Sequence, residues 1–282
     1  MLIREVIEKM KAYHKGEFNG EVIKEETTRD KILYGDPDRE CTGIVTTCWA
    51  TAEVIREAAD RGANLIIAHE ALFWNHGDHI DWLQEEGNKT FAAKKKLLDD
   101  NGIVVWRNHD YIHSGIPMED GSYVDGIFYG VADKLGWTDY ITHDTTNPLH
   151  YEIPQISAKE LADFLIERLH LNGIKVIGDL DTSVRKIKIP FHVLGDARDD
   201  IRQANEEGID CFLTMEIVDF TLAEYIRDSS MLGQNKVVLG MGHFNLEEPG
   251  MEYMLNYIGK ALGEDIPCSF VQSGDMYEYI TK

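Results

Sequence analysis

The sequence has few basic residues for its length. Lysine and arginine together number 28, against 50 aspartates and glutamates, so the formal net charge is −22. A surface with this sign repels the phosphate backbone of DNA and RNA, because binding to that backbone depends on lysine and arginine contacts. We therefore exclude nucleic acid as a partner.

Close cysteine pairs and long apolar runs are missing as well. Cys41, Cys48, Cys211 and Cys268 have neither zinc-ribbon nor disulfide-framework spacing, which is typical of thiols in a reducing compartment. No apolar run approaches the ~18 residues of a membrane span. Residues 1–14 carry a charge every few positions, unlike the unbroken apolar core of a signal peptide. We expect a soluble, cytoplasmic protein.

Helix and strand patterns alternate along the chain. The 282 residues are 43% apolar, which is enough for a sizeable core. Apolar runs at 65–68, 103–106 and 237–239 have the length of buried strands, and each follows a segment with helical periodicity. This βαβ alternation predicts an α/β fold with mixed sheets flanked by helices.

A repeated pattern suggests two related lobes. Periodicity weakens between 137 and 154, so we place a first lobe at 1–145 and a second at 146–282. Residues 55–70 and 201–216 match in a helix, the glycine that ends it, a strand and a terminal glutamate. Similar packing explains the apolar matches but not the polar ones. We expect a pseudo-twofold chain with a metal site at the junction of the lobes, and a C-terminal part that packs back on the first lobe.

Histidines and glutamates follow three of the predicted strands. The pairs are His69 with Glu70, His109 with His113, and His243 with Glu247. Ligands of α/β sheets bind at the carboxyl ends of the strands. Imidazole mixed with carboxylate suits zinc, manganese, iron or cobalt better than calcium or magnesium, and five or six converging donors favour two ions over one. The pattern therefore predicts a dinuclear transition-metal site.

Four blocks resemble the NIF-three-like family (NGG-one-interacting factor three), whose bacterial members are often labelled GTP cyclohydrolase I type two. In the family's order, the blocks are GANLIIAHE at 62–70, HDYIH at 109–113, FLTME at 212–216 and GHFNLE at 242–247. The resemblance implies a two-lobed α/β fold, two adjacent divalent metal ions per chain (zinc, iron or manganese) and a homohexamer.

The family's metal ligands fall, by position, on five residues of this chain. They are His69, Glu70, His113, His243 and Glu247. Two of them depart from the family's pattern, which has histidine at position 70 and aspartate at position 113. The departures offset each other, so three imidazoles and two carboxylates are retained. This donor set suits a rearranged two-metal site.

The resemblance implies a metal-dependent hydrolase whose small-molecule substrate is a nucleotide or related heterocycle. His109 and Glu216, which are not among the implied ligands, are the candidates for moving protons. Two other interpretations stay open. One is a non-catalytic hexameric scaffold that holds metal. The other is a site without metal, in which the histidines and glutamates hydrogen-bond to one another.

Overall fold

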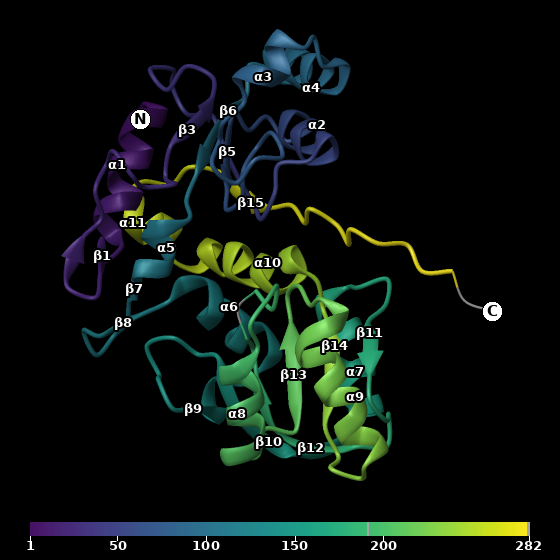
Figure 1. The fold of residues 1–282 in the computed structure, drawn as a ribbon. Coiled ribbons are helices and arrows are strands. Elements are labelled where there is room, and N and C mark those ends of the chain that lie inside the picture. The colour runs from purple at the N-terminus through teal and green to yellow at the C-terminus, as the bar shows by residue number, and fades with distance from the viewer. Residues whose placement is uncertain (191, 281–282) are drawn as a thin grey trace. The chain divides into compact units, whose positions relative to one another are not determined.

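The chain forms two compact units in the computed structural model, which describes residues 1–190 and 192–280 (Figure 1). Unit 1 consists of Met1–Gly130 and Gly250–Ser273, and unit 2 consists of Val131–Pro249 and Gly274–Lys282. Each unit contains its own sheet and its own hydrophobic core.

The division differs from a single break at 145/146. The ring centroid of Trp137 lies 5.2 Å from that of Tyr151 and 6.1 Å from that of Phe164, so the segment after residue 130 packs within unit 2. Strand β15 (Cys268–Phe270) pairs with β4 (Ile44–Thr47) in unit 1. Unit 1 is therefore assembled from two segments that flank residues 131–249 in the sequence.

Unit 1 is built on a five-stranded sheet with the order β15-β4-β5-β6-β3. Its other strands are β5 (Leu65–Ala68), β6 (Val104–Arg107) and β3 (Ile32–Tyr34). Only β3 runs antiparallel to its neighbour. All residues of β4, β5 and β6 are buried, as expected for parallel strands that are covered on both faces.

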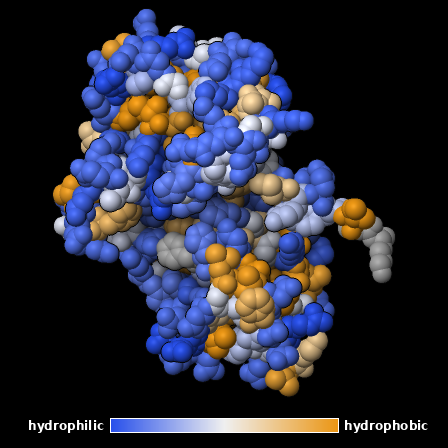
Figure 2. Space-filling view, turned by 45° about the horizontal axis from the view of Figure 1, so that its top comes forward, coloured by the Kyte–Doolittle hydropathy of each residue, from blue (hydrophilic) through white to orange (hydrophobic). Residues whose placement is uncertain are grey.

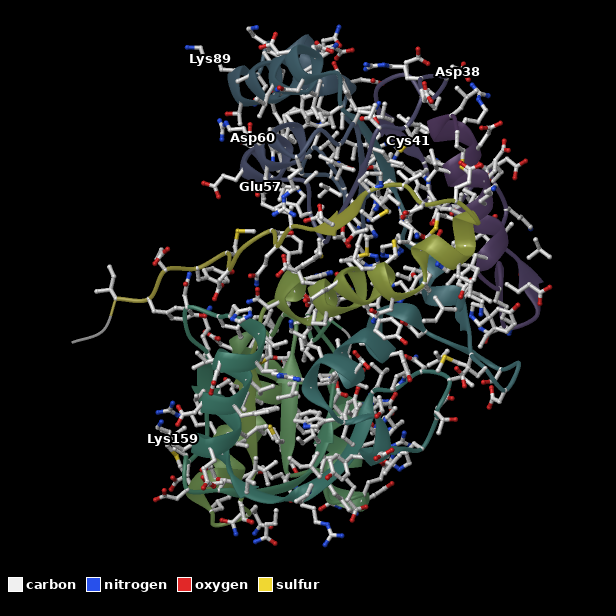
Figure 3. The ribbon with its side chains drawn as sticks, turned by 180° about the vertical axis from the view of Figure 1, so that it is seen from behind. Asp38, Cys41, Glu57, Asp60, Lys89 and Lys159 are labelled. Carbon is white, nitrogen blue, oxygen red and sulfur yellow. The ribbon has the colours of Figure 1, made fainter. Side chains whose placement is uncertain are left out.

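Helices cover the sheet of unit 1. Helix α2 (Ala52–Asp60) begins at Thr51, whose hydroxyl accepts the Val54 N–H, and it shares a core with β4, β5 and α4 (Lys89–Asn101). Glu57, Asp60 and Lys89 point away from the ribbon (Figure 3). The remaining elements wholly in unit 1 are α1 (Ile3–Tyr13), β1 (Glu17–Phe18), β2 (Glu21–Val22), α3 (Asp81–Glu85), α5 (Asp110–Ser114), β7 (Ile116–Pro117), β8 (Tyr123–Val124), η3 (Met254–Asn256) and α11 (Ile258–Leu262).

A buried histidine follows α1. The Nδ1 atom of His14 donates to the Met10 carbonyl over 2.6 Å, and the residue is only 4% exposed. Burial lowers the pKa of His14 from 6.5 to about 4. The folded chain therefore holds this imidazole in its neutral form at a pH where the unfolded chain protonates it.

Acid is expected to destabilise unit 1 through His14. Because the pKa is depressed in the folded state, stability falls as the pH drops from about 6.5 towards 4, by roughly 3 kcal/mol. The variant His14→Asn keeps a donor for the Met10 carbonyl but does not titrate. Urea unfolding of both chains at about pH 7 and pH 4 measures the effect. The same pH dependence in the two chains would contradict it.

Unit 2 is built on a six-stranded sheet with the order β11-β14-β13-β12-β10-β9. The strands are β9 (Ile141–Thr142), β10 (His150–Ser157), β11 (Lys175–Ile177), β12 (Ser183–Lys188), β13 (Cys211–Thr214) and β14 (Val237–Gly240). Strands β12, β13 and β14 are parallel, and the other pairings are antiparallel. The sheet is therefore mixed, with a parallel centre.

One helix of unit 2 begins at a clear capping signal. Helix α7 (Ala158–Leu169) begins with a capping box formed by Ser157 and Glu160. The other helical elements that lie wholly in unit 2 are η1 (Thr138–Tyr140), α8 (Arg198–Glu206), η2 (Asp219–Ala223) and α9 (Glu224–Met231). Ala204 of α8 and Ile226 of α9 share a core with Phe212 and Val238 of the central strands.

The two sheets share a topological motif. Residues 55–70 cover most of α2 and all of β5, and residues 201–216 cover most of α8 and all of β13. Each of these strands is the middle one of three parallel neighbours. The prediction of an α/β fold with mixed sheets is confirmed.

Two helices contain a boundary between the units. Helix α6 (Gly126–Leu135) spans the boundary at 130/131, and α10 (His243–Tyr253) spans the one at 249/250. The face shown in Figure 2 is mostly hydrophilic, with separate hydrophobic patches. None of the described helices is long and apolar enough to cross a membrane.

Candidate metal centre

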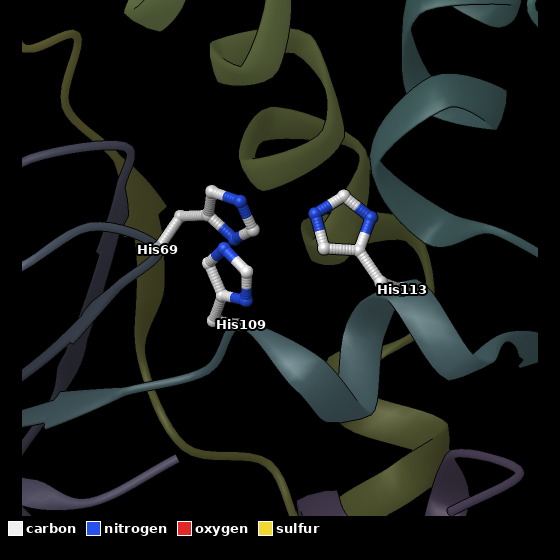
Figure 4. A group of neighbouring side chains, drawn as sticks. All are labelled: His69, His109 and His113. Carbon is white, nitrogen blue, oxygen red and sulfur yellow. The ribbon is translucent and has the colours of Figure 1, made fainter. Parts of the chain in front are cut away.

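Three histidines of unit 1 lie together at one edge of its sheet. His69 follows β5, and His109 and His113 lie at the beginning and in the last turn of α5, which follows β6. Because β5 and β6 are parallel neighbours, the residues after both strands reach the same edge. One ring nitrogen of each histidine lies within 4.8 Å of the others (Figure 4).

Each of the three rings is oriented through its Nδ1 atom. His69 Nδ1 donates to the Asn108 carbonyl oxygen over 3.1 Å. His109 Nδ1 donates to Asp110 over 2.9 Å, and His113 Nδ1 donates to Asp125 over 2.8 Å. A neutral imidazole that donates from Nδ1 carries its lone pair on Nε2, which is how metal-binding histidines are oriented.

The two aspartates that orient these rings are themselves held by other groups. Asp125 uses its second carboxylate oxygen to accept the N–H groups of Ile127 and Phe128, over 2.9 and 3.1 Å, at the start of α6. Asp110 uses its second oxygen to accept the Thr28 hydroxyl and the Arg29 N–H. Burial raises the pKa of Asp110, but hydrogen bonds from His109, Arg29 and Thr28 outweigh it, so the pKa is lowered.

The donor chemistry of this group suits a transition metal. Burial and the neighbouring imidazoles His69 and His113 lower the pKa of His109 to about 3, against the opposing effect of Asp110. His109 is therefore neutral at neutral pH, as a metal ligand must be. Convergent imidazoles whose Nδ1 atoms are bonded to carboxylate or carbonyl oxygens fit zinc, iron or manganese and do not fit calcium.

Glu70 lies beside the three histidines and is paired with a buried arginine. Its Oε2 atom accepts from Arg107 over 3.0 Å, and its Oε1 atom lies 3.9 Å from His109 Nε2. The Arg107 side chain is fully buried and also donates to Asp78 over 3.2 Å and to the His76 carbonyl oxygen over 2.9 Å. One carboxylate oxygen of Glu70 thus holds the arginine while the other faces the imidazoles.

Unit 2 contains a second group of ligand-type side chains. Glu216 follows β13 and His243 begins α10 after β14, while an isolated bridge between Val193 and Ile217 brings His192 to the same edge. One ligand atom from each of His192, Glu216 and His243 lies within 4.8 Å of the other two.

Glu216 joins the two histidines of this second group. It accepts from His192 Nδ1 over 2.7 Å with one oxygen, and its other oxygen contacts His243 Nδ1. Burial raises the pKa of Glu216, but the hydrogen bonds from His243 and His192 outweigh it, so the pKa is lowered. One turn along α10, Glu247 contacts His243 Nε2 over 3.0 Å. The group is therefore rich in negative charge as well as imidazole.

A cavity of about 330 Å³ in unit 2 opens on this second group. Glu216 and His243 are among its lining residues, and Lys175 supplies a positive charge. Its apolar lining includes Met215, Phe244, Met276, Tyr277 and Tyr279. The cavity has the size and the aromatic lining to accept a small planar molecule.

The residues expected from the sequence are divided between the units. Unit 1 contains the expected ligands His69, Glu70 and His113, together with His109. Unit 2 contains the expected ligands His243 and Glu247, together with Glu216. His109, expected to move protons, lies among the imidazoles of unit 1, and Glu216 holds two histidines of unit 2.

Sequence reasoning missed four residues around these groups. They are Arg107, Asp110, Asp125 and His192. Asp125 has a local signal, because an aspartate before Gly126 is typical of a helix N-cap. His192 follows an apolar run but has no matching residue in the first half of the chain, so the repeat did not indicate it.

The chain is similar to known proteins over most of its length. It is 23% identical over 242 residues to a Clostridium acetobutylicum protein named GTP cyclohydrolase 1 type 2 homolog, covering 85% of both chains. It is 24% identical over 270 residues to a Clostridium perfringens protein of the same name, covering 92% of this chain and 94% of that one.

Solved structures share the fold. A Staphylococcus aureus hypothetical protein superposes with a TM-score of 0.67 at 17% identity, covering 99% of both chains. A Bacillus cereus protein related to NIF3 superposes with a TM-score of 0.66 at 15% identity and the same coverage. Residues 30–275 match the model of the family described as Duf34/NIF3 (NGG1p interacting factor 3). The chain belongs to this family.

Proposed function

We propose that the chain is a divalent-metal-dependent hydrolase that acts on a nucleotide or a related small heterocycle. The observation that carries the proposal is the group of three imidazoles in unit 1, each oriented through Nδ1 by a carbonyl or carboxylate oxygen. The acceptors are Asn108, Asp110 and Asp125, none of which is an implied ligand. Mutual hydrogen bonding among the implied ligands therefore does not account for how these rings are held.

We propose two ions per chain, zinc, iron or manganese. In unit 1, His69, His109 and His113 would hold one ion, with Glu70 beside them. In unit 2, His243 would hold the other with Glu247. Bound ions would supply Lewis acidity and lower the pKa of a water molecule, which is the chemistry that metal-dependent hydrolysis uses.

The side chains of unit 2 can move a proton during hydrolysis. The lowered pKa of Glu216 keeps it ionised at neutral pH, so it can accept a proton. The His192 side chain is 48% exposed and bonds to the same carboxylate, so it can exchange that proton with solvent. We propose Glu216 as the general base and assign His109 to metal binding rather than to proton transfer.

The substrate class is supported by the cavity beside His243. Its aromatic lining suits a planar heterocycle, and Lys175 offers a positive charge to a phosphate in a chain whose net charge is −22. The Lys175 Nζ atom lies 4.8 Å from the centre of the Tyr277 ring, so the charge is positioned next to an aromatic face. The names of the two clostridial relatives support the same substrate class.

Metal content of single variants tests the two ion sites. We expect His113→Asn and His243→Asn each to remove about one ion per chain, because asparagine keeps the Nδ1-like donor and lacks Nε2. Inductively coupled plasma mass spectrometry on chelator-free protein measures the loss. His79→Asn and His170→Asn, at exposed histidines outside both groups, are the controls. Unchanged metal content in both test variants would refute the assignment.

Turnover is tested separately on the metal-loaded protein. Zinc-, iron- and manganese-loaded chains are incubated with GTP and with free purines, and the products are separated by chromatography. We expect hydrolysis that His113→Asn abolishes and His79→Asn does not. Full metal occupancy without turnover would leave a metal-holding scaffold as the function.

A further inference from the structure

A separate cluster of ligand-type side chains lies elsewhere in unit 2. His143 follows β9, His150 begins β10 and Glu207 ends α8. One ligand atom from each of the three lies within 4.8 Å of the other two. The ring centroids of the two histidines are 4.5 Å apart, and His143 Nε2 lies 3.7 Å from a Glu207 oxygen. None of the three belongs to the groups of the proposed hydrolytic site.

The cluster lines a cavity of about 300 Å³. Glu152, Glu206 and Lys186 also line it. The Nζ atom of Lys186 donates to the Glu207 carbonyl oxygen over 2.9 Å, so this lysine is held at the backbone and leaves the Glu207 carboxylate to the cavity. The cavity therefore has room for an ion with a bound water molecule, and carboxylates to balance its charge.

One buried nitrogen in the cluster lacks a hydrogen bond. Among the described residues, His150 Nε2 has no hydrogen-bond partner although it is buried. Burial and the neighbouring His143 lower the pKa of His150 to about 4, so the ring is neutral at neutral pH. A buried polar atom without a partner destabilises the folded state, and coordination of a metal ion would offset this loss.

The backbone of His143 is also unusual. Its φ is +61°, in the left-handed region that residues with a Cβ atom seldom adopt. Such a conformation is energetically unfavourable and is concentrated at binding and catalytic sites. Here it places the imidazole of His143 against that of His150 across the end of the β9–β10 pair.

We propose that His143, His150 and Glu207 bind one zinc ion. Two imidazoles and one carboxylate, with a fourth position for water, are an established zinc donor set. Ligand atoms around tetrahedral zinc lie roughly 3.3 Å apart, so the present spread must narrow. The His143 and Glu207 side chains, which are 53% and 35% exposed, would have to rotate toward His150. The bound ion would connect the loop at 143–149 to the end of α8.

Zinc titration of a chain without the hydrolytic ligands tests the proposal. The background variant carries His113→Asn and His243→Asn, which are expected to remove the two proposed hydrolytic ions, so the titration reports on the remaining cluster whether or not the proposed function is correct. Isothermal titration calorimetry of the metal-free protein with zinc is expected to show one site per chain. No binding in this background would overturn the proposal.

The matched comparison uses two histidines with similar backbones. His143 and His170 both have left-handed φ angles, +61° and +55°, which asparagine tolerates. Added to the background, His143→Asn is expected to weaken zinc binding more than about 10-fold, and His170→Asn to leave it unchanged. Glu207→Gln, at a partly exposed carboxylate, is expected to weaken binding without disturbing the fold. Equal zinc affinity in the His143→Asn and His170→Asn chains would contradict the site.

Discussion

Replacing Arg107 by methionine is expected to lower the free energy of unfolding by about 3–5 kcal/mol. The arginine side chain is fully buried and pairs with Glu70 over 3.0 Å and with Asp78 over 3.2 Å. It also donates to the His69 carbonyl oxygen over 3.1 Å. Methionine fills a similar volume but leaves the Glu70 carboxylate without its counter-charge. Urea unfolding followed by circular dichroism measures the change.

Two further variants distinguish the loss of the buried ion pair from a nonspecific effect of replacing an arginine. Arg4→Met breaks an ion pair with Asp38 whose partners are 51% and 59% exposed, and such pairs contribute at most about 1 kcal/mol. Glu70→Met combined with Arg107→Met is expected to be less destabilising than Arg107→Met alone, because the buried Glu70 carboxylate is no longer left without its counter-charge. If Arg107→Met costs no more than Arg4→Met, the buried network does not stabilise unit 1.

Gly250→Ala is expected to destabilise the chain by more than about 3 kcal/mol or to prevent folding. A Cβ atom at this position of α10 would lie 2.4 Å from Ile127 Cα and 2.9 Å from the Ile127 carbonyl oxygen. Both contacts are with backbone atoms, which a rotamer change cannot relieve. The two helices must therefore separate, or the local backbone must distort. Thermal unfolding and soluble yield measure the outcome.

Gly259→Ala is the matched control for Gly250→Ala. Gly259 lies in α11, has no left-handed φ, and would place its Cβ atom in open space. Alanine stabilises a helix interior by up to about 1 kcal/mol relative to glycine. We expect a small increase in the melting temperature for Gly259→Ala and a large decrease for Gly250→Ala. Similar small shifts in both would show that the backbones at Gly250 and Ile127 separate easily.

The fold class and the residues at the strand ends are predictable because they depend on local pattern. Buried strands appear in the sequence as short apolar runs. The residues after β5, β6 and β14 include the histidines that the structure places at sheet edges. The repeat adds Glu216, which matches Glu70 in the first half. Helix caps such as Thr51 are local as well. These features require no knowledge of which segments meet.

The partners of these residues depend on contacts between distant segments. Asp125 reads as a helix cap, but its bond to His113 depends on how α5 and α6 pack. Lys94 begins a run of three lysines, a pattern that predicts the solvent-exposed face of a helix. In the structure, Lys94 is buried, donates to the Leu72 carbonyl oxygen over 2.7 Å and lies 5.2 Å from the Trp49 ring. Burial lowers its pKa to about 8.

The return of residues 250–273 to unit 1 affects the order in which the chain can fold on the ribosome. Strand β15 pairs with β4, which is made more than 200 residues earlier, so the sheet of unit 1 lacks its edge strand until residues 131–249 have been synthesised. Residues 131–249 of unit 2 are contiguous and leave the exit tunnel before β15 does. Nascent unit 1 therefore exposes an unpaired edge of β4 throughout the synthesis of that segment, and an unpaired edge of this kind can pair with a strand of another chain.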